Sequence, residues 1–147
     1  MNFELKIKKL CENATVPTYG SAFAAGADLY ACESGDVTIA PNETKLIHTG
    51  IAMAIPEGLV GLIYARSGLA SKRGLAPANK VGVIDSDYRG EIMVALHNHG
   101  NAAQKIENGE RIAQIVFTPY AAAEFSVTDQ LDDTARGAGG FGSTGSN

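Results

Sequence analysis

The sequence has no tryptophan, only two cysteines and a charged fraction of 19%, with a formal net charge of -4. Two cysteines are too few for a disulfide scaffold, and Cys11 and Cys32 have neither a CxxC spacing nor neighbouring metal ligands. The small negative charge argues against a surface for nucleic acid or membrane, so any nucleotide contact must be local. No apolar run approaches the roughly 20 residues of a membrane span, and residues 1–9 lack the apolar centre of a signal peptide. We therefore expect a cytoplasmic protein.

Short segments of alternating apolar and polar residues dominate the rest of the chain. With 147 residues and 45% hydrophobic content, the chain has the length of one domain and can bury a core. Turn residues separate the segments, which is typical of a β-meander or sandwich. Residues 67–73 have the composition of a short helix. We therefore predict an all-β fold with one short helix and with strands at residues 3–8, 37–40, 45–55, 59–65 and 110–118.

The chain is organised around residues 81–93, where apolar segments at residues 81–84 and 91–96 flank a polar loop at residues 85–90. This composition predicts a β-hairpin with a longer turn. If the strand continues into the loop, Asp85 and Asp87 point to one face and Tyr88 points to the other. Asp, Ser and Gly are also ordinary turn formers, so a purely structural loop is the alternative interpretation.

Groups suited to phosphate binding lie on both sides of this loop in the sequence. Arg66 and Ser67 stand where the predicted helix starts, and free N–H groups at a helix start attract phosphate. Gln114 lies in a strand predicted to be buried on both faces, where its amide needs a neighbour or a ligand. Asp28 suits a structural carboxylate at least as well as a catalytic one. The GxxxxGK[ST] loop is absent, which excludes a P-loop hydrolase.

The histidines do not predict a metal site. His97 and His99 form an HxH pair, but no third His or Cys ligand is near them in the sequence. A solvated turn at residues 97–100 is the better interpretation. His48 lies in a strand pattern and is interpreted as structural.

The C-terminal residues 131–147 are rich in glycine, serine and threonine, and no helix or strand is predicted there. A flexible linker is one interpretation. The other is an arm that orders over a bound nucleotide. Arg136 can pair with a phosphate, Phe141 can stack on a base, and Ser143 and Thr144 can donate hydrogen bonds. An extended arm, at ~3.3 Å per residue, is long enough to reach a neighbouring subunit.

Five separated stretches form an ordered set. They are residues 25–29 (AGADL), 66–70 (RSGLA), 82–90 (GVIDSDYRG), 109–114 (GERIAQ) and 136–145 (RGAGGFGSTG). Together they resemble, over essentially the whole chain, the five motifs of the trimeric deoxyuridine triphosphate nucleotidohydrolases (dUTPases). The resemblance implies a jelly-roll-like β fold, a homotrimer with shared active sites, and Mg2+-dependent hydrolysis of dUTP to dUMP and pyrophosphate. Such an enzyme would lower dUTP and supply dUMP for thymidylate synthesis.

The resemblance also implies roles for individual residues. Asp85 would orient and activate the water that attacks the α-phosphorus, and Tyr88 would pack against the sugar and exclude a 2′-hydroxyl. The implied substrate-binding set is Arg66, Ser67, Gly68, Asn79, Val83, Ile84, Asp85, Tyr88, Met93, Gln114, Arg136, Phe141, Gly142, Ser143 and Thr144. Mg2+ would have no direct protein ligand, because the triphosphate would carry it, with Asp28 in contact through water. Residues 1–130 would form the β domain, and residues 131–147 would be the arm that closes an active site, of a neighbouring subunit.

Two other functions stay open at this point. A dCTP deaminase-like enzyme would share the fold, but its reaction needs a general acid or base at the amino-bearing carbon of the pyrimidine. The loop at residues 85–90 offers no spare Glu for that role. A nucleotide-sensing protein that binds a protein partner would use the same site without turnover. Release of ammonia from dCTP, or pyrophosphate from dUTP, separates these functions.

Overall fold

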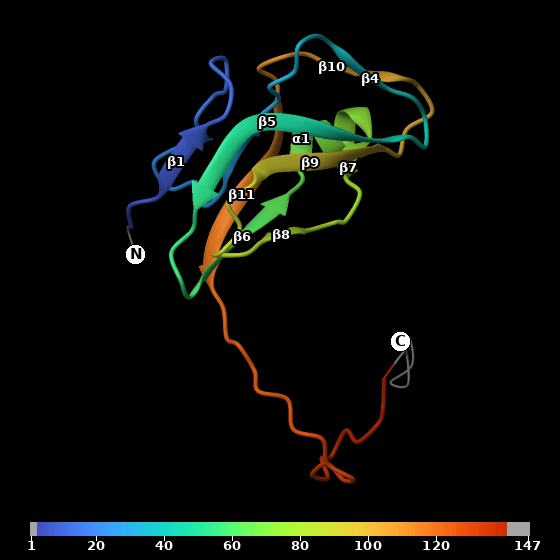
Figure 1. Ribbon diagram of the computed structural model, residues 1–147. Coiled ribbons are helices and arrows are strands. Elements are labelled where there is room, and N and C mark those ends of the chain that lie inside the picture. Colours follow the sequence, from blue (N-terminus) through green and yellow to red (C-terminus); the bar gives the residue numbers. More distant parts are fainter. Residues whose placement is uncertain (1–2, 141–147) are drawn as a thin grey trace.

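The computed structural model describes residues 3–140, and these residues form two main antiparallel sheets (Figure 1). The four-stranded sheet has the order β1 (Lys6–Lys9), β5 (Thr44–Ala54), β9 (Glu91–Asn98), β7 (Leu75–Pro77). The five-stranded sheet has the order β2 (Thr18–Tyr19), β3 (Ala27–Tyr30), β11 (Arg111–Pro119), β6 (Leu59–Tyr64), β8 (Gly82–Ile84). β4 (Val37–Ile39) and β10 (Gln104–Ile106) form a separate pair. The predicted all-β, jelly-roll-like fold is confirmed.

The core lies between the sheets and follows the alternation of the long strands. In β9, Ile92, Val94 and Leu96 are buried, while the residues between them are partly exposed. Ile112 and Ile115 of β11 are also fully buried. Val116 and Phe117 of the same strand are partly buried, so its apolar residues are at least partly covered on both faces. Period-two alternation in the sequence therefore located most of the strands correctly.

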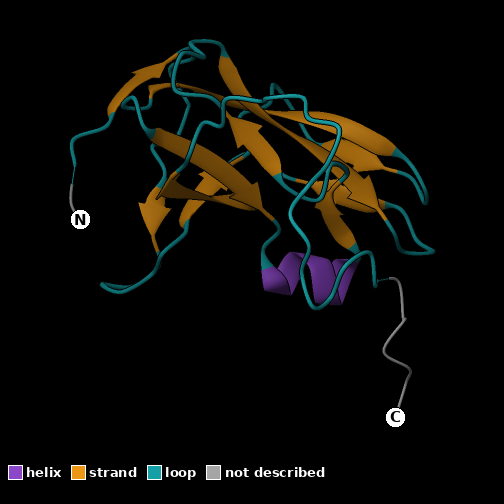
Figure 2. Cartoon of the chain, turned by 90° about the horizontal axis from the view of Figure 1, so that it is seen from below, coloured by secondary structure: helices purple, strands orange, loops and turns teal. Residues whose placement is uncertain are grey.

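The helix α1 (Ser67–Arg73) has the predicted bounds and covers one end of the sheets (Figure 2). Gly74 ends it in the left-handed conformation, and its N–H group bonds back to Ala70 O. Among the described residues, this helix is far too short to cross a membrane. β2, β7 and β10 were missed, because these two or three residues show too little periodicity of their own.

The predicted turn at residues 97–100 is partly wrong, because His97 and Asn98 belong to β9. Asn98 is completely buried, and its side-chain amide donates to Ile39 O at 2.9 Å and to Ala102 O at 2.8 Å. These hydrogen bonds allow Asn98 to be buried at the end of a strand, although the composition of residues 97–100 predicts a turn.

The predicted β-hairpin of residues 81–96 is wrong. β8 pairs with β6 in the five-stranded sheet, whereas β9 pairs with β5 and β7 in the four-stranded sheet. Residues 85–90 therefore cross from one sheet to the other, and we call them the crossover loop. A polar loop between two apolar segments fits both arrangements, since the local sequence does not specify which strand lies alongside.

Cys11 and Cys32 form a disulfide, which their spacing in the sequence did not predict. The fold brings the loop after β1 beside the residues that follow β3. Gly50 lies under this pair with a φ angle of +65°, and a side chain there would come within 2.6 Å of Cys11 Sγ. Glycine is therefore required at this position both by conformation and by space.

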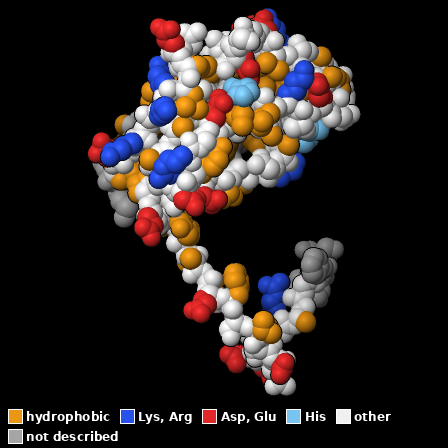
Figure 3. All heavy atoms as spheres, viewed as in Figure 1, with side chains coloured by type: hydrophobic (Ala, Val, Ile, Leu, Met, Phe, Trp, Pro, Cys, Tyr) orange, Lys and Arg blue, Asp and Glu red, His pale blue; other side chains and the backbone are white. Residues whose placement is uncertain are grey.

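Beyond Pro119 the chain leaves the sheets and runs away from the domain as an extended arm (Figures 1 and 3). Phe125, Val127 and Leu131 are 95%, 100% and 87% exposed. The last described strand thus ends earlier than the boundary predicted at residue 130. Arg136 is the one predicted substrate-binding residue of the arm that the structure describes, and Phe141, Gly142, Ser143 and Thr144 lie outside the described residues.

Candidate active site

Asp28 joins two arginines, Arg66 just before α1 and Arg111 at the start of β11, and we call these three residues the Asp28 cluster. Arg66 Nε donates to Asp28 Oδ1 at 2.7 Å, and Arg111 Nη1 donates to Oδ2 at 3.3 Å. Asp28 is only 8% exposed, while both guanidinium groups reach the surface. Two positive charges on one carboxylate leave a net positive cluster with unused N–H donors, which suits phosphate oxygens.

Gln114 lies between Asp28 of β3 and Tyr64 of β6. Its Nε2 donates to Ala65 O at 2.9 Å, which answers the need for a partner predicted from the sequence. A side chain at Gly26 would collide with this amide, coming 3.0 Å from Gln114 Cδ. Gln114 therefore sits in a tight frame directly beside Arg66.

Helix α1 presents Ser67 and Gly68 beside the same cluster. Arg66 has an extended conformation before the helix, and the first N–H groups of the helix have no carbonyl partner within it. At the other end of α1, Arg73 donates to Glu110 and, at 3.0 Å, to Gln104 Oε1. The ion pair at Arg73 fixes the helix against the residues that precede β11. The structure thus brings together Arg66, Ser67, Gly68 and Gln114.

Replacing Asp28 with Asn should destabilise the protein by about 1–3 kcal/mol, because the two arginines would lose the carboxylate that compensates them in a largely buried position. The denaturant midpoint measures this change. Asp36→Asn is the matched control, because Asp36 pairs with Lys105 at an exposed position. Equal midpoints for both variants would show that the Asp28 cluster does not stabilise the fold.

The crossover loop is held by bonds within itself. Asp85 O accepts the Tyr88 N–H at 3.2 Å, and Arg89 Nη1 donates to Ser86 O at 2.6 Å. β8 ends at Ile84, so the alternation predicted for Asp85, Asp87 and Tyr88 as strand residues does not apply. Asp85 is exposed and borders a groove of about 830 Å³ lined by Ile55, Glu57, Val60, Leu62, Val83, Asp85, Ser86, Asp87, Arg89 and Tyr120.

The remaining predicted pyrimidine-site residues lie on the strands around this loop. Asn79 precedes β8, where its O atom accepts the Val81 N–H at 2.7 Å. Val83 and Ile84 belong to β8 itself, and Met93 stands in β9 opposite His48. Arg111 and Glu91 have polar contacts at the site but were not predicted. Their charges carried no signal, because partners distant in the sequence decide their roles.

Tyr88 folds back over Gly90. Its hydroxyl donates to Glu91 O at 3.0 Å, and a Cβ atom on Gly90 would lie 2.5 Å from Tyr88 Cζ.

Gly90→Ala should therefore push the Tyr88 ring aside at little cost in stability, since Tyr88 is at the surface. We expect weaker discrimination between dUTP and UTP in the ratio of their kcat/KM values, as in Tyr88→Ala. Gly35→Ala is the control, because a Cβ atom there meets open space. Gly58→Ala is not suitable, because the φ angle of +83° at Gly58 would strain any side chain.

Asp85 and the Asp28 cluster lie at opposite ends of the β6–β8 pair. The strands are antiparallel, with Ile63 opposite Gly82 and Gly61 opposite Ile84. Asp85 therefore continues towards Val60, while Arg66 follows the other end of β6. Six residues of strand at ~3.3 Å each place these two positions ~20 Å apart along β6. One copy of the chain does not bring its water-activating candidate to its own phosphate-binding cluster.

Metal ligands are sparse in the described part of the chain. Residues 3–140 contain no group of three or more His, Cys, Asp or Glu side chains that could hold a metal ion. Both oxygens of Asp28 are engaged by arginines. Their remaining lone pairs suit a hydrogen bond from a metal-bound water better than direct coordination.

A family model described as dUTPase matches residues 12–145. The deoxyuridine 5'-triphosphate nucleotidohydrolase of Nautilia profundicola is 54% identical over 142 residues, covering 97% of this chain and 99% of that protein. The protein of the same name from Desulfitobacterium hafniense (strain DSM 10664 / DCB-2) is 54% identical over 131 residues, covering 88% of this chain and 87% of that protein.

Solved structures agree with these relatives. The dUTPase of Staphylococcus bacteriophage 80alpha with dUPNHPP has a TM-score of 0.90 and 31% identity, covering 99% of this chain and 100% of that one. The structure of a variant dUTPase from phage phi11 of S. aureus shows the coordination of a structural Mg(II) ion. It has a TM-score of 0.78 and 27% identity to this chain. It covers 88% of this chain and 99% of that one.

Proposed function

The chain belongs to the dUTPase family and is a dUTP diphosphatase, and from this premise we propose that each active site is assembled from more than one copy of the chain. The observation that carries this proposal is the antiparallel register of β6 and β8, which separates Asp85 from the Asp28 cluster. A closed symmetric oligomer repeats one contact around a ring, so the crossover loop of one copy can face the Asp28 cluster of another. The family resemblance favours a homotrimer.

Within such a site, one copy of the chain would activate the attacking water and a neighbouring copy would bind the phosphates. Asp85 orients a water in line with the α-phosphorus and accepts its proton. Arg66, Ser67, Gly68 and Gln114 of a neighbouring copy bind phosphate oxygens and offset the charge that develops on them. Hydrolysis of a phosphoanhydride depends mainly on this positioning. The products are dUMP and pyrophosphate.

The pyrimidine nucleoside would be bound by the strands around the crossover loop. Tyr88 packs against the deoxyribose, while Asn79 and the backbone of Val83 and Ile84, together with Met93, surround the uracil. A site that hydrogen-bonds the pyrimidine edge rejects cytosine, because a mismatched base leaves buried polar groups unpaired. The chain would thereby lower dUTP and supply dUMP for thymidylate synthesis. A cytoplasmic location stays a prediction.

Mg2+ is the cofactor that fits this donor set. The described residues offer no direct cage, whereas a triphosphate supplies the oxygen ligands that Mg2+ prefers. The ion neutralises phosphate charge when the substrate carries it to the site. Asp28 is the residue that would contact it, through a water molecule.

The arm would close the site over a neighbouring copy. Phe125, Val127 and Leu131 are too exposed for an isolated chain, and a neighbouring subunit would bury them. In this arrangement Arg136 adds a guanidinium to the phosphates, and Phe141, Gly142, Ser143 and Thr144 complete the contacts with the nucleotide. In the described structure Arg136 Nε bonds to Gly139 O, and this bond would be exchanged for phosphate.

Product analysis combined with particle mass tests the proposed function. With dUTP and Mg2+, we expect dUMP and pyrophosphate in equal amounts, from a particle with three times the mass of the chain. Ammonia from dCTP would instead indicate a deaminase. Binding of dUTP without turnover would indicate a sensor. Full activity in a monomer would contradict the shared site.

A further inference from the structure

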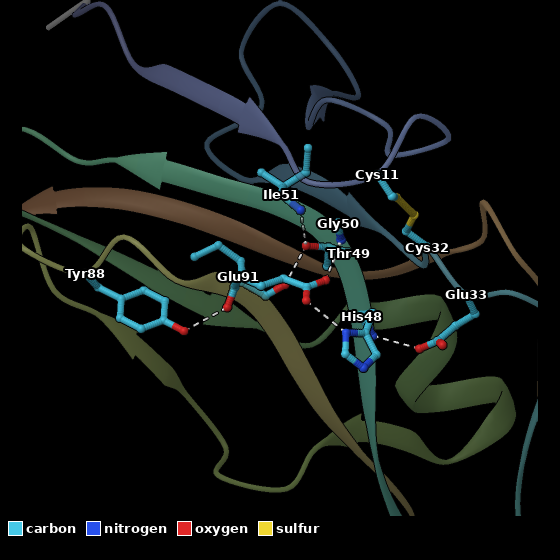
Figure 4. A network of polar contacts seen from close by, with 10 residues as sticks. Cys11, Cys32, Glu33, His48, Thr49, Gly50, Ile51, Tyr88 and Glu91 are labelled. Atoms are coloured by element: carbon cyan, nitrogen blue, oxygen red, sulfur yellow. Dashed lines mark hydrogen bonds and ion pairs between the residues drawn. A yellow bond between two sulfur atoms is a disulfide. The ribbon is translucent and has the colours of Figure 1, made fainter.

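Glu91 connects the crossover loop to the four-stranded sheet through both its backbone and its side chain (Figure 4). Its carbonyl oxygen accepts the hydroxyl of Tyr88 at 3.0 Å. One carboxylate oxygen accepts the Gly50 N–H at 2.8 Å, and the other lies 2.9 Å from His48 Nδ1. The residue that holds Tyr88 is therefore itself held by two groups of β5.

The β5 groups that bind Glu91 lie in an irregular part of the strand. The register between β5 and β9 shifts between His48 and Ala52, and Gly50 has a left-handed conformation there. A bulge removes ladder partners from backbone N–H groups. The carboxylate of Glu91 supplies the missing acceptor for Gly50, and the Thr49 hydroxyl bonds to Ile92 O next to it. The start of β9 is thus fixed by side chains as well as by the pairing of Glu91 with Ala52.

The contact between Glu91 and His48 has the character of an ion pair. The hydrogen bond to Glu91 raises the pKa of His48 above 6.5, against a smaller opposing effect of burial, and the charges of Glu91 and Glu33 add to the rise. Partial burial raises the pKa of Glu91, but hydrogen bonds from His48 and Gly50 outweigh it, so that the pKa is lowered. Glu33 is the other charged group near His48, and its Oε1 accepts a hydrogen bond from the backbone N–H of His48 at 2.8 Å.

We propose that Glu91 is a positioning residue that fixes Tyr88 and so determines how well the enzyme distinguishes deoxyribose from ribose. The proposal rests on the role proposed above for Tyr88. The carboxylate holds the first residue of β9, which directs the Glu91 carbonyl at the tyrosine hydroxyl. Without this anchor, the end of the crossover loop is free to shift, and the ring no longer occupies the space that a 2′-hydroxyl needs.

The test is the ratio of kcat/KM for dUTP to kcat/KM for UTP. Glu91→Ala should lower this ratio by roughly 2- to 13-fold, the factor that one net hydrogen bond typically contributes. Glu91→Gln should lower it less, because its amide oxygen still accepts the Gly50 N–H. Glu43→Gln is the matched control, because Glu43 also accepts a backbone N–H and pairs with a cation, Lys45, far from the loop. An unchanged ratio in the Glu91 variants would overturn the proposal.

The pH dependence of the same ratio gives an independent readout. A raised His48 pKa means that the ion pair is complete below pH 6.5 and is lost as the pH rises through the folded-state pKa. The ratio should therefore decline with rising pH in the unmodified enzyme and be flat in His48→Ala. Titration of the phosphates and the base cancels, because dUTP and UTP share both. A ratio that does not vary with pH would contradict the role of His48.

Tyr88→Ala separates failure of this inference from failure of the proposed function. If Tyr88→Ala lowers the ratio and Glu91→Ala does not, Glu91 does not position the ring. If neither variant changes it, Tyr88 does not exclude ribose. Should Glu91→Ala fail to fold, Glu91→Gln and the pH profile of the unmodified enzyme decide the question.

Discussion

Asp85→Asn should lower kcat for dUTP by about 10²- to 10⁴-fold, the range that a positioned general base contributes. Asparagine has nearly the same shape but cannot accept the proton of the attacking water. The substitution is at an exposed loop position, so the fold and the assembly should be retained. Pyrophosphate release measures turnover, and binding of a non-hydrolysable dUTP analogue shows whether the site is still formed.

Asp87→Asn is the control for this experiment, since Asp87 is the second carboxylate of the crossover loop and borders the same groove. We expect a small effect on kcat, because its role is in the turn. If Asp87→Asn abolishes turnover and Asp85→Asn does not, the two roles must be exchanged. Near-normal turnover in both variants would place water activation elsewhere.

Deleting residues 136–147 should leave a folded domain that binds dUTP weakly. The deletion should lower kcat/KM by at least ~10³-fold, which is the lower end of what an arginine contributes to a phosphoryl-transfer transition state. Among residues 3–140 the last strand ends at Pro119, so the deletion spares every strand that the structure describes. Circular dichroism and the melting temperature check the fold, and pyrophosphate release measures the loss. A fully active truncated protein would mean that the arm is only a linker.

Mixing the truncated chain with the Asp85→Asn chain tests directly whether sites are shared. Mixed assemblies contain sites that combine the intact Asp85 of one chain with the intact arm of the other. Activity should rise above the sum of the two separate proteins after subunit exchange. The control carries both changes in one chain and is mixed with Asp85→Asn, so no fully intact site can form. No recovery in the first mixture would show that loop and arm act within one subunit.

The sequence by itself determined the elements that depend on neighbours along the chain. The side-chain patterns of residues 45–55 and 110–118 identified β5 and β11, because successive side chains of a strand point to opposite faces of the sheet. The composition of residues 67–73 gave the correct bounds of α1. The five ordered stretches indicated the family, because each is a continuous segment of sequence that can be recognised without knowledge of tertiary contacts.

Tertiary structure decided every feature that depends on partners distant in the sequence. It placed β8 and β9 in different sheets, paired Asp28 with both Arg66 and Arg111, joined Cys11 to Cys32, and set Glu91 against His48. Backbone hydrogen bonding is the same for any strand, so a short apolar segment does not encode its neighbour. The separation of Asp85 from the phosphate-binding cluster, and with it the argument for a shared site, follows from that choice of neighbour.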